Sequence, residues 1–342
     1  MNRLRLILIS LFLAASVVVV VAYNLHKPRV LVLQSYDLTY PWTREVSVGL
    51  RRVLDEHSHF AVRWFYMDTK RHPEKEFKQK MGLAARQSID RWNPDVIIAV
   101  DDDAQEFVTR HYVNHPGIRI VFAGVNGGVE PYGFAGAGNV TGIFERKDLP
   151  ALKEALIALR WQRQAAGPLR VVHIGDTSSS VEHDDHYMRE FDWRPLVNLP
   201  SRRPGTFDDW KQAVLEVQGK TDFILTTNYR KLARDASNRS LVPPEEVVAW
   251  TVANSHVPVV GTNGFFVEDG GELAIGTSPF EQGEVAARMA VKLLGGQVAK
   301  DIPHASTRQF VVYMRSARLH QRGMELPPLY EAFARATNND LP

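Results

Sequence analysis

Short apolar runs without polar alternation recur along this chain, and they restrict its fold more than any other feature. Residues 95–100 read DVIIAV, and residues 118–125 read IRIVFAGV. Strands that are apolar on both sides are typical of a parallel sheet covered by helices on both faces. Amphipathic segments such as residues 74–92 separate these runs, which indicates right-handed βαβ units. The sequence therefore predicts an α/β protein with doubly wound parallel sheets.

The strand pattern occurs twice, which predicts two lobes joined by a hinge. The expected strands are 30–33, 61–67, 95–100, 118–125, 169–175, 194–199, 222–227, 257–261, 272–276 and 308–314. Helices are expected after Thr43, over residues 104–113, and over residues 148–161, with Thr43 and Asp148 as N-caps. Between the two series, residues 133–144 read GFAGAGNVTGIF, a glycine-rich crossing that suits a hinge.

The N-terminal residues 1–23 have the pattern of an export signal. Arg3 and Arg5 precede an uncharged apolar run over residues 6–23, which resembles the h-region of a signal peptide. The run also reaches the roughly 18 residues of a transmembrane candidate, so an uncleaved membrane anchor is the alternative. The arginines place the N-terminus in the cytoplasm. Residues from 24 onward are therefore expected to be periplasmic or otherwise extracytoplasmic, either free or tethered.

Composition excludes several classes of function. The hydrophobic share of 44% and charged share of 23% are those of a globular protein. Lys and Arg number 41 against 39 Asp and Glu, and no basic run occurs, so nucleic acid is not expected as a partner. The absence of cysteine excludes disulfides, thiolate metal sites and a cysteine nucleophile.

Polar and aromatic residues follow the expected strands at their carboxyl ends, where open parallel sheets bind ligands. Those of the first lobe are Gln34, Ser35, Tyr36, Trp42, Asp101, Asp102, Asp103 and Asn126. Those of the second lobe are Thr177, Ser178, Asn228, Tyr229 and Asn263. Aromatic faces, hydroxyls, amides and carboxylates of this kind can enclose a small polar molecule.

Each group has an expected role in binding such a molecule. Tyr36 and Trp42 would stack on the ligand, whereas the hydroxyls of Ser35, Thr177 and Ser178 would donate to a ligand carboxylate. One of the three consecutive aspartates, helped by Asn228 or Asn263, would bind an ammonium or amide.

Structural alternatives exist for the same residues. The aromatic side chains at 40–42 could plug the sheet edge, and an aspartate of 101–103 could cap the helix that follows or hold Mg²⁺. The run HDDH, His183 to His186, offers four metal ligands, although a polar surface loop explains it equally well. No Gly-x-Ser-x-Gly elbow or P-loop occurs, and no metal or cofactor is expected.

Several stretches, taken in order, resemble the ABC-transporter substrate-binding protein family, whose relatives include tryptophan- and tyrosine-type binders. These are DVIIAVDDDA, IVFAGVNGGV, GNVTGIF, EQGEVAARMAVKLLGGQVAKDIPH and FVVYMRSARLHQRGMELPPLYEAFA. The resemblance extends from Arg29 to Ala334. It departs from the family at Asn126-Gly127-Gly128, where Asp-Pro is common, and at Tyr313, where asparagine is usual. These departures leave the class of ligand open.

The resemblance implies a type I periplasmic-binding-protein fold with the ligand in a cleft between two lobes. The implied domains are 1–23, signal peptide or anchor; 24–143, lobe 1, to which 272–306 returns; 144–271, lobe 2, to which 307–325 recrosses; and 326–342, a C-terminal tail. The implied function is a non-enzymatic solute-binding protein that delivers a small polar ligand, an amino acid or aromatic acid being candidates, to an ABC permease and ATPase in the inner membrane. The alternatives are a membrane-tethered sensor for a signalling partner and an exported metal-dependent enzyme.

Overall fold

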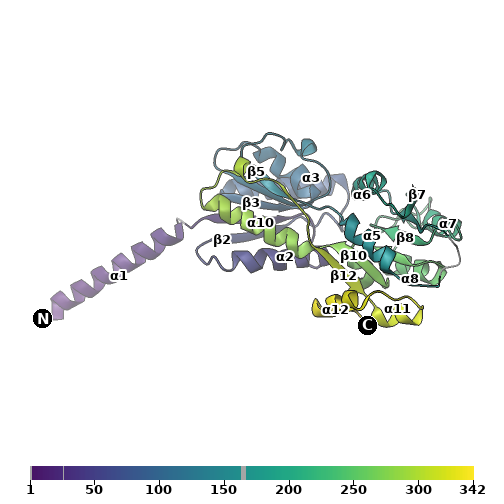
Figure 1. Ribbon diagram of the computed structural model, residues 1–342. Coiled ribbons are helices and arrows are strands. Elements are labelled where there is room, and N and C mark those ends of the chain that lie inside the picture. Colours follow the sequence, from purple (N-terminus) through teal and green to yellow (C-terminus); the bar gives the residue numbers. More distant parts are fainter. Residues whose placement is uncertain (1, 26, 163–166) are drawn as a thin grey trace. The chain divides into compact units, whose positions relative to one another are not determined.

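The computed structural model describes residues 2–25, 27–162 and 167–342, and these form two compact units (Figure 1). Unit 1 comprises Met1–Ala123, Val129–Gly142 and Gly283–His304. Unit 2 comprises Gly124–Gly128, Ile143–Gln282 and Ala305–Pro342. Each unit therefore combines segments that are far apart in the sequence.

The first sheet has six strands in the order β11-β5-β4-β3-β1-β2. The strands are β1 (Arg29–Gln34), β2 (Ala61–Tyr66), β3 (Val96–Val100), β4 (Arg119–Val125), β5 (Val140–Phe144) and β11 (Ala305–Ser306). Strand β1 pairs in parallel with both β2 and β3, and β3 pairs in parallel with β4. The side chains of β3 are all buried, as its uninterrupted apolar sequence predicts.

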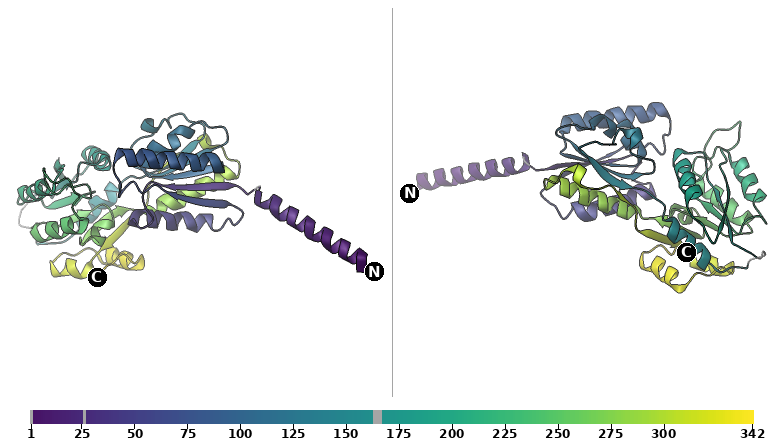
Figure 2. Two further views of the ribbon diagram at one scale, coloured as in Figure 1. Left: turned by 180° about the vertical axis from the view of Figure 1, so that it is seen from behind. Right: turned by 45° about the horizontal axis from the view of Figure 1, so that its top comes forward.

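Helices cover both faces of this sheet. They are α2 (Pro41–Leu54), α3 (Lys75–Trp92), α4 (Asp102–Phe107) and α10 (Pro279–Leu294), with short 3₁₀ turns at Thr109–Tyr112, Glu130–Tyr132 and Ala299–Asp301. Figures 1 and 2 show α2 and α3 on opposite faces, with α10 beside α2. Gly283 permits this close approach, because a Cβ atom there would lie 2.0 Å from the carbonyl oxygen of Val46.

The second sheet repeats the strand order of the first, as β12-β10-β9-β8-β6-β7. The strands are β6 (Arg170–Ile174), β7 (Val197–Arg202), β8 (Phe223–Thr226), β9 (Val259–Gly261), β10 (Leu273–Thr277) and β12 (Phe310–Met314). The pairings are parallel except that β12 runs antiparallel to β10.

Two hydrophobic clusters pack on this second sheet. The helices around it are α5 (Leu149–Ala158), α6 (Ser179–Glu190), α7 (Phe207–Glu216), α8 (Pro244–Asn254), α9 (Phe265–Glu268), α11 (Ser316–Gln321) and α12 (Pro328–Ala336). Phe223 and Leu225 of β8 belong to the cluster with α5, whereas Ile224 belongs to the cluster with α7 and α8. This alternation follows from the two-residue period of a strand, and it buries both faces of the sheet.

The predicted α/β class with two largely parallel sheets is confirmed, while some local predictions are wrong. Thr43 is not an N-cap, because α2 already begins at Pro41 and Thr43 is buried within it. The helix predicted over 104–113 ends at Phe107, where Val108 leaves helical geometry with φ −130°, and a 3₁₀ turn follows. Asp148 caps α5 as predicted, since its Oδ1 accepts a hydrogen bond of 2.9 Å from the Ala151 amide.

The N-terminal segment forms one helix, α1 (Asn2–Leu25). Apolar side chains along it, including Leu8, Phe12 and Val18, are exposed. In the part of the chain that the structure describes, no helix combines the length and apolar character needed to cross a bilayer. The signal peptide and the membrane anchor both stay predictions from the sequence.

Candidate functional site

Ser35 lies directly after β1 and joins three segments of unit 1. Its hydroxyl donates to the carbonyl oxygen of Val100 (2.6 Å) and accepts from the amide of Ala104 (2.8 Å). A hydroxyl carries one proton, so Ser35 has no donor left for a ligand carboxylate in this conformation. The hydrogen bond from the Ala104 amide to Ser35 also caps the N-terminus of α4, whereas the side chain of Asp101 makes no capping hydrogen bond there. The interpretation of an aspartate as this helix cap was therefore wrong.

The three consecutive aspartates have different surroundings. Asp101 is buried and has φ 66°, a left-handed conformation that is uncommon outside glycine. Asp102 accepts a hydrogen bond of 2.5 Å from the hydroxyl of Tyr132, and Asp103 forms an ion pair of 2.9 Å with Lys78. Asp102 and Asp103 thus already have protein partners.

The aromatic residues of the first loop are partly structural. The rings of Tyr36 and Tyr40 meet edge-on, with 5.3 Å between their centroids. Burial and the nearby Asp101 raise the pKa of the Tyr36 hydroxyl. Trp42 is only 8% exposed. Among the described residues its indole Nε1 has no hydrogen-bond partner, and neither has Oε1 of the buried Gln34. An unsatisfied buried polar atom is costly, so Trp42 and Gln34 remain candidates for ligand contact.

In unit 2, the predicted residues after β6 and β8 largely hold their own turns. Asp176 accepts from the amide and the hydroxyl of Ser178, so that hydroxyl also lacks a proton for a ligand carboxylate. The side chain of Asn228 accepts from the amides of Tyr229 and Arg230. Thr177 is exposed. Tyr229 lies in the core, and its hydroxyl donates to Asp269 at 2.5 Å.

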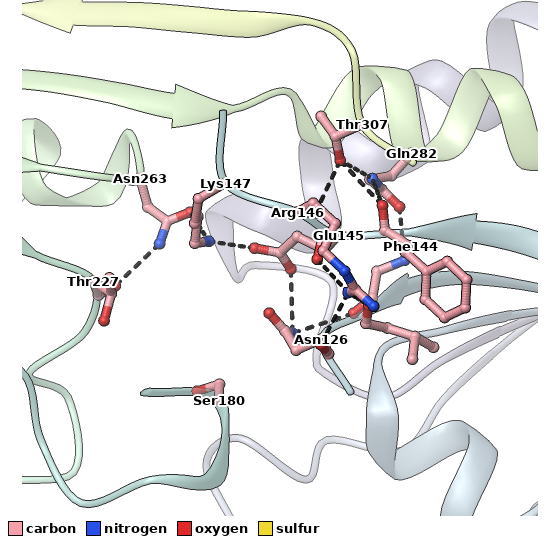
Figure 3. A network of polar contacts seen from close by, with 12 residues as sticks. Asn126, Phe144, Glu145, Arg146, Lys147, Ser180, Thr227, Asn263, Gln282 and Thr307 are labelled. Atoms are coloured by element: carbon pink, nitrogen blue, oxygen red, sulfur yellow. Dashed lines mark hydrogen bonds and ion pairs between the residues drawn. The ribbon is translucent and has the colours of Figure 1, made fainter. Parts of the chain in front are cut away.

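Asn263 and Asn126 belong to a buried polar network in unit 2 that the sequence interpretation missed (Figure 3). Lys147 Nζ contacts Glu145 Oε1 at 2.5 Å and Asn263 Oδ1 at 3.2 Å. The other carboxylate oxygen of Glu145 accepts from Asn126 Nδ2 at 3.3 Å. Asn263 in turn donates to the carbonyl oxygen of Thr227 at 3.0 Å. The side chains of Lys147 and Glu145 are 6% and 8% exposed, so this is a buried ion pair.

Arg146 and Gln282 hold the chain segments that pass between the units. The guanidinium of Arg146 donates to the carbonyl oxygens of Val125, Asn126, Gly127 and Glu145 at 2.8–3.0 Å. Gln282 accepts from the Gly124 amide at 2.8 Å and donates to Phe144 and Thr307 (Figure 3). Charged and amide side chains thus satisfy backbone groups where the strands β4, β5 and β11 end.

The HDDH run is helical, because it lies within α6. Asp185 contacts Nδ1 of the buried His173 at 3.3 Å, and Nε2 of His173 contacts the Thr227 hydroxyl at 3.1 Å. The hydrogen bond with His173 lowers the pKa of Asp185 to about 2. The surface-loop interpretation is therefore wrong. A metal site gains no support either, since the described residues contain no group of three or more metal ligands.

Asp184, which precedes Asp185 in α6, is 7% exposed and accepts no hydrogen bond from any described residue. The pKa of the Asp184 carboxyl is raised, mainly by burial. The positive charge of Lys147 acts in the opposite direction, and the negative charge of Glu145 adds to the rise. Spacing along the chain gives no signal that Asp184 lies near residues 145–147.

Two α/β units with the same strand order, and with polar side chains gathered at the carboxyl ends of the strands, define a two-lobe binding-protein fold of type I. The family described as ABC transporter substrate binding protein matches residues 220–329. This match confirms the resemblance predicted from the sequence.

Solved structures show the same fold over most of the chain. A conserved domain protein from Vibrio cholerae has a TM-score of 0.62 at 16% identity and covers 90% of this chain and 98% of its own. An ABC domain in complex with L-Trp from Streptococcus pneumonia has a TM-score of 0.63 at 15% identity, with coverages of 90% and 98%. A ligand-free, open substrate binding protein with adhesive properties from Clostridium difficile has a TM-score of 0.63 at 17% identity, with coverages of 88% and 96%. A search of curated protein sequences found no significant match.

Proposed function

We propose that this protein is an extracytoplasmic solute-binding protein of an ABC import system, without catalytic activity of its own. Its strand-end residues bind a small polar solute, and the liganded form delivers that solute to a membrane permease and its ATPase. The observation that carries the proposal is that two buried polar atoms are unsatisfied among the described residues: Gln34 Oε1 in the last residue of β1, and Trp42 Nε1 in the first turn of α2, the helix that follows β1. This is the edge at which sheets of this kind bind ligands.

The fold and the family match support the same function. Residues 220–329 match a family of substrate-binding proteins, and a structural neighbour was solved in complex with L-Trp. Amino acids and aromatic acids are therefore the first candidates for the solute. Ligand contacts that form only in one conformation would shift the population of the protein toward it.

The test is a thermal-shift screen of the purified protein against amino acids, aromatic acids, sugars and nucleosides. A solute at 100 times its Kd adds about 2.7 kcal/mol to the free energy of unfolding, which is a measurable rise in Tm. We expect one chemical class to raise Tm. A screen in which no solute raises Tm would contradict the proposed function.

A variant locates the site within unit 1. Trp42→Phe removes the indole N–H and keeps an aromatic ring, so the solute-induced rise in Tm should fall while the Tm of the unliganded protein changes little. Trp92→Phe at the end of α3 is the control. A large loss of Tm without solute would instead favour the alternative in which Trp42 plugs the sheet edge.

A further inference from the structure

A surface groove in unit 1 lies between α3 and the segment that follows β3. Its volume is about 660 Å³, within the roughly 300–1,000 Å³ that is usual for ligand pockets. The residues that line it come from α3, from the end of α4 and from the 3₁₀ turn Thr109–Tyr112. The groove is therefore distinct from the strand-end residues of the candidate solute site.

Contacts within unit 1 fix the walls of this groove. Gly82 lets α3 approach α4 closely, because a Cβ atom there would lie 2.8 Å from the Cβ atom of Phe107. Lys78 of α3 and Asp103 of α4 also join the two helices through an ion pair of 2.9 Å. The groove is thus formed before any partner arrives, which reduces the entropy that binding costs.

Positive side chains dominate the lining of the groove. The side chains with a full positive charge at neutral pH are Lys75, Lys80, Arg86 and Arg110. The described lining contains one acidic residue, Glu106. Among the residues that the structure describes, none of the four cations forms an ion pair with a carboxylate, and Arg86 donates instead to Nε2 of His111 at 2.5 Å. Like charges gathered in one groove repel one another, and an anion bound there would offset this repulsion.

The extent of the groove indicates an extended anion. The lining residues of α3 run from Lys75 to Arg86, about 16 Å along the helix at 1.5 Å per residue. A single phosphate or carboxylate would meet only part of that stretch. An extended peptide of about five residues spans all of it.

An apolar patch and the concave shape favour a protein segment over a membrane. Leu83 lies on the α3 wall between Lys80 and Arg86, and it is 50% exposed. The half-buried Phe107 lines the other wall. An apolar side chain flanked by acidic residues can pack against both, whereas the flat surface of a bilayer would reach only the rim of a groove.

We propose that this groove is the docking surface for an acidic segment of a partner protein. Its four cations bind carboxylates of the segment, and Leu83 and Phe107 bind an apolar side chain between them. The inference goes beyond the proposed function, because it assigns a partner surface outside the solute site and does not depend on which solute binds.

The test measures, by fluorescence anisotropy, how the purified full-length protein binds a blocked peptide of glutamates with one central leucine. Two comparison peptides replace the glutamates by glutamines or the leucine by glycine. The variant Lys80→Gln/Arg110→Gln removes two exposed cations of the groove. The control variant Lys220→Gln/Arg239→Gln removes one exposed lysine and one exposed arginine from unit 2. Far-UV circular dichroism checks the fold of each variant.

The acidic peptide should bind the wild type and the control variant, and the glutamine peptide should bind neither. The Kd should rise about tenfold in Lys80→Gln/Arg110→Gln, because two surface ion pairs are lost. Leu83→Ser should weaken binding of the leucine peptide and leave that of the glycine peptide unchanged.

Three results would overturn the inference. If the groove variant and the control variant bind the acidic peptide equally well, the peptide binds elsewhere. If vesicles of phosphatidylglycerol or free pyrophosphate bind through Lys80 and Arg110 and the peptide does not, the groove is a lipid or small-anion site. If the peptide fails to bind the wild type at about 0.1 M salt, where charges still interact over about 10 Å, the docking surface does not exist. The solute screen is independent of all three, so the proposed function is tested separately.

Discussion

The buried ion pair of Lys147 and Glu145 permits a quantitative test of how unit 2 is stabilised. Lys147→Met keeps an unbranched apolar side chain and removes the ammonium that contacts Glu145 at 2.5 Å and Asn263 at 3.2 Å. Removing one partner of a buried pair leaves the other charge uncompensated, which costs about 3–5 kcal/mol. Asp184 also loses the attraction of this ammonium. At about 2–4 °C per kcal/mol for a unit of this size, Tm should fall by roughly 6–20 °C.

The measurement is urea unfolding followed by far-UV circular dichroism, with scanning calorimetry as a second probe. The control is Lys211→Met, because Lys211 pairs with Asp208 at 3.2 Å on the surface, where an ion pair contributes about 0–1 kcal/mol. The double variant Glu145→Gln/Lys147→Met removes both charges and should recover most of the lost stability, since replacing a whole buried pair is often nearly neutral.

Two results would refute this reasoning. If Lys147→Met costs no more than Lys211→Met, water solvates the pair and its burial has no energetic consequence. If the double variant is as unstable as the single one, the loss comes from packing or from the Asn263 contact and not from an uncompensated carboxylate.

Three further predictions concern other parts of the molecule. Gly283→Ala should lower the free energy of unfolding by about 1–3 kcal/mol or more, because its Cβ would meet the Val46 carbonyl oxygen at 2.0 Å. Urea unfolding measures this loss, and an unchanged midpoint would contradict the close helix approach. Tyr229→Phe should lower the free energy of unfolding by about 1.5–3 kcal/mol, because Asp269 loses the hydroxyl that donates to it. Calorimetry should show an unchanged affinity for the solute. Weaker binding would place Tyr229 in the site. The pKa of Asp185 lies at about 2, below its usual 3.8, so its ionised form stabilises the fold above pH 4 and this contribution disappears as pH falls through 2. The Tm of the wild type should therefore fall more steeply between pH 4 and 2 than that of Asp185→Asn, and parallel curves would contradict the His173 contact.

The sequence by itself determined the class of fold. Uninterrupted apolar runs such as residues 96–100 identify strands that are buried on both sides, and helices between them imply parallel order. The N-cap at Asp148 was also predictable, because a cap depends on the three residues that follow it. These features could be predicted because the burial of a side chain in a strand or helix follows the repeat of apolar residues along that element.

Only the tertiary structure decided which polar groups meet. The residue that caps α4 is Ser35, 69 positions away, and not one of the adjacent aspartates. Lys147 meets Asn263 across 116 positions, and Asp184 of α6 interacts electrostatically with Glu145 and Lys147, which lie in the loop before α5. Each unit is likewise assembled from separate segments of the chain. Such contacts depend on how strands are ordered and where helices return over a sheet. The local repeat of apolar residues carries no information about which distant segments of the chain will meet.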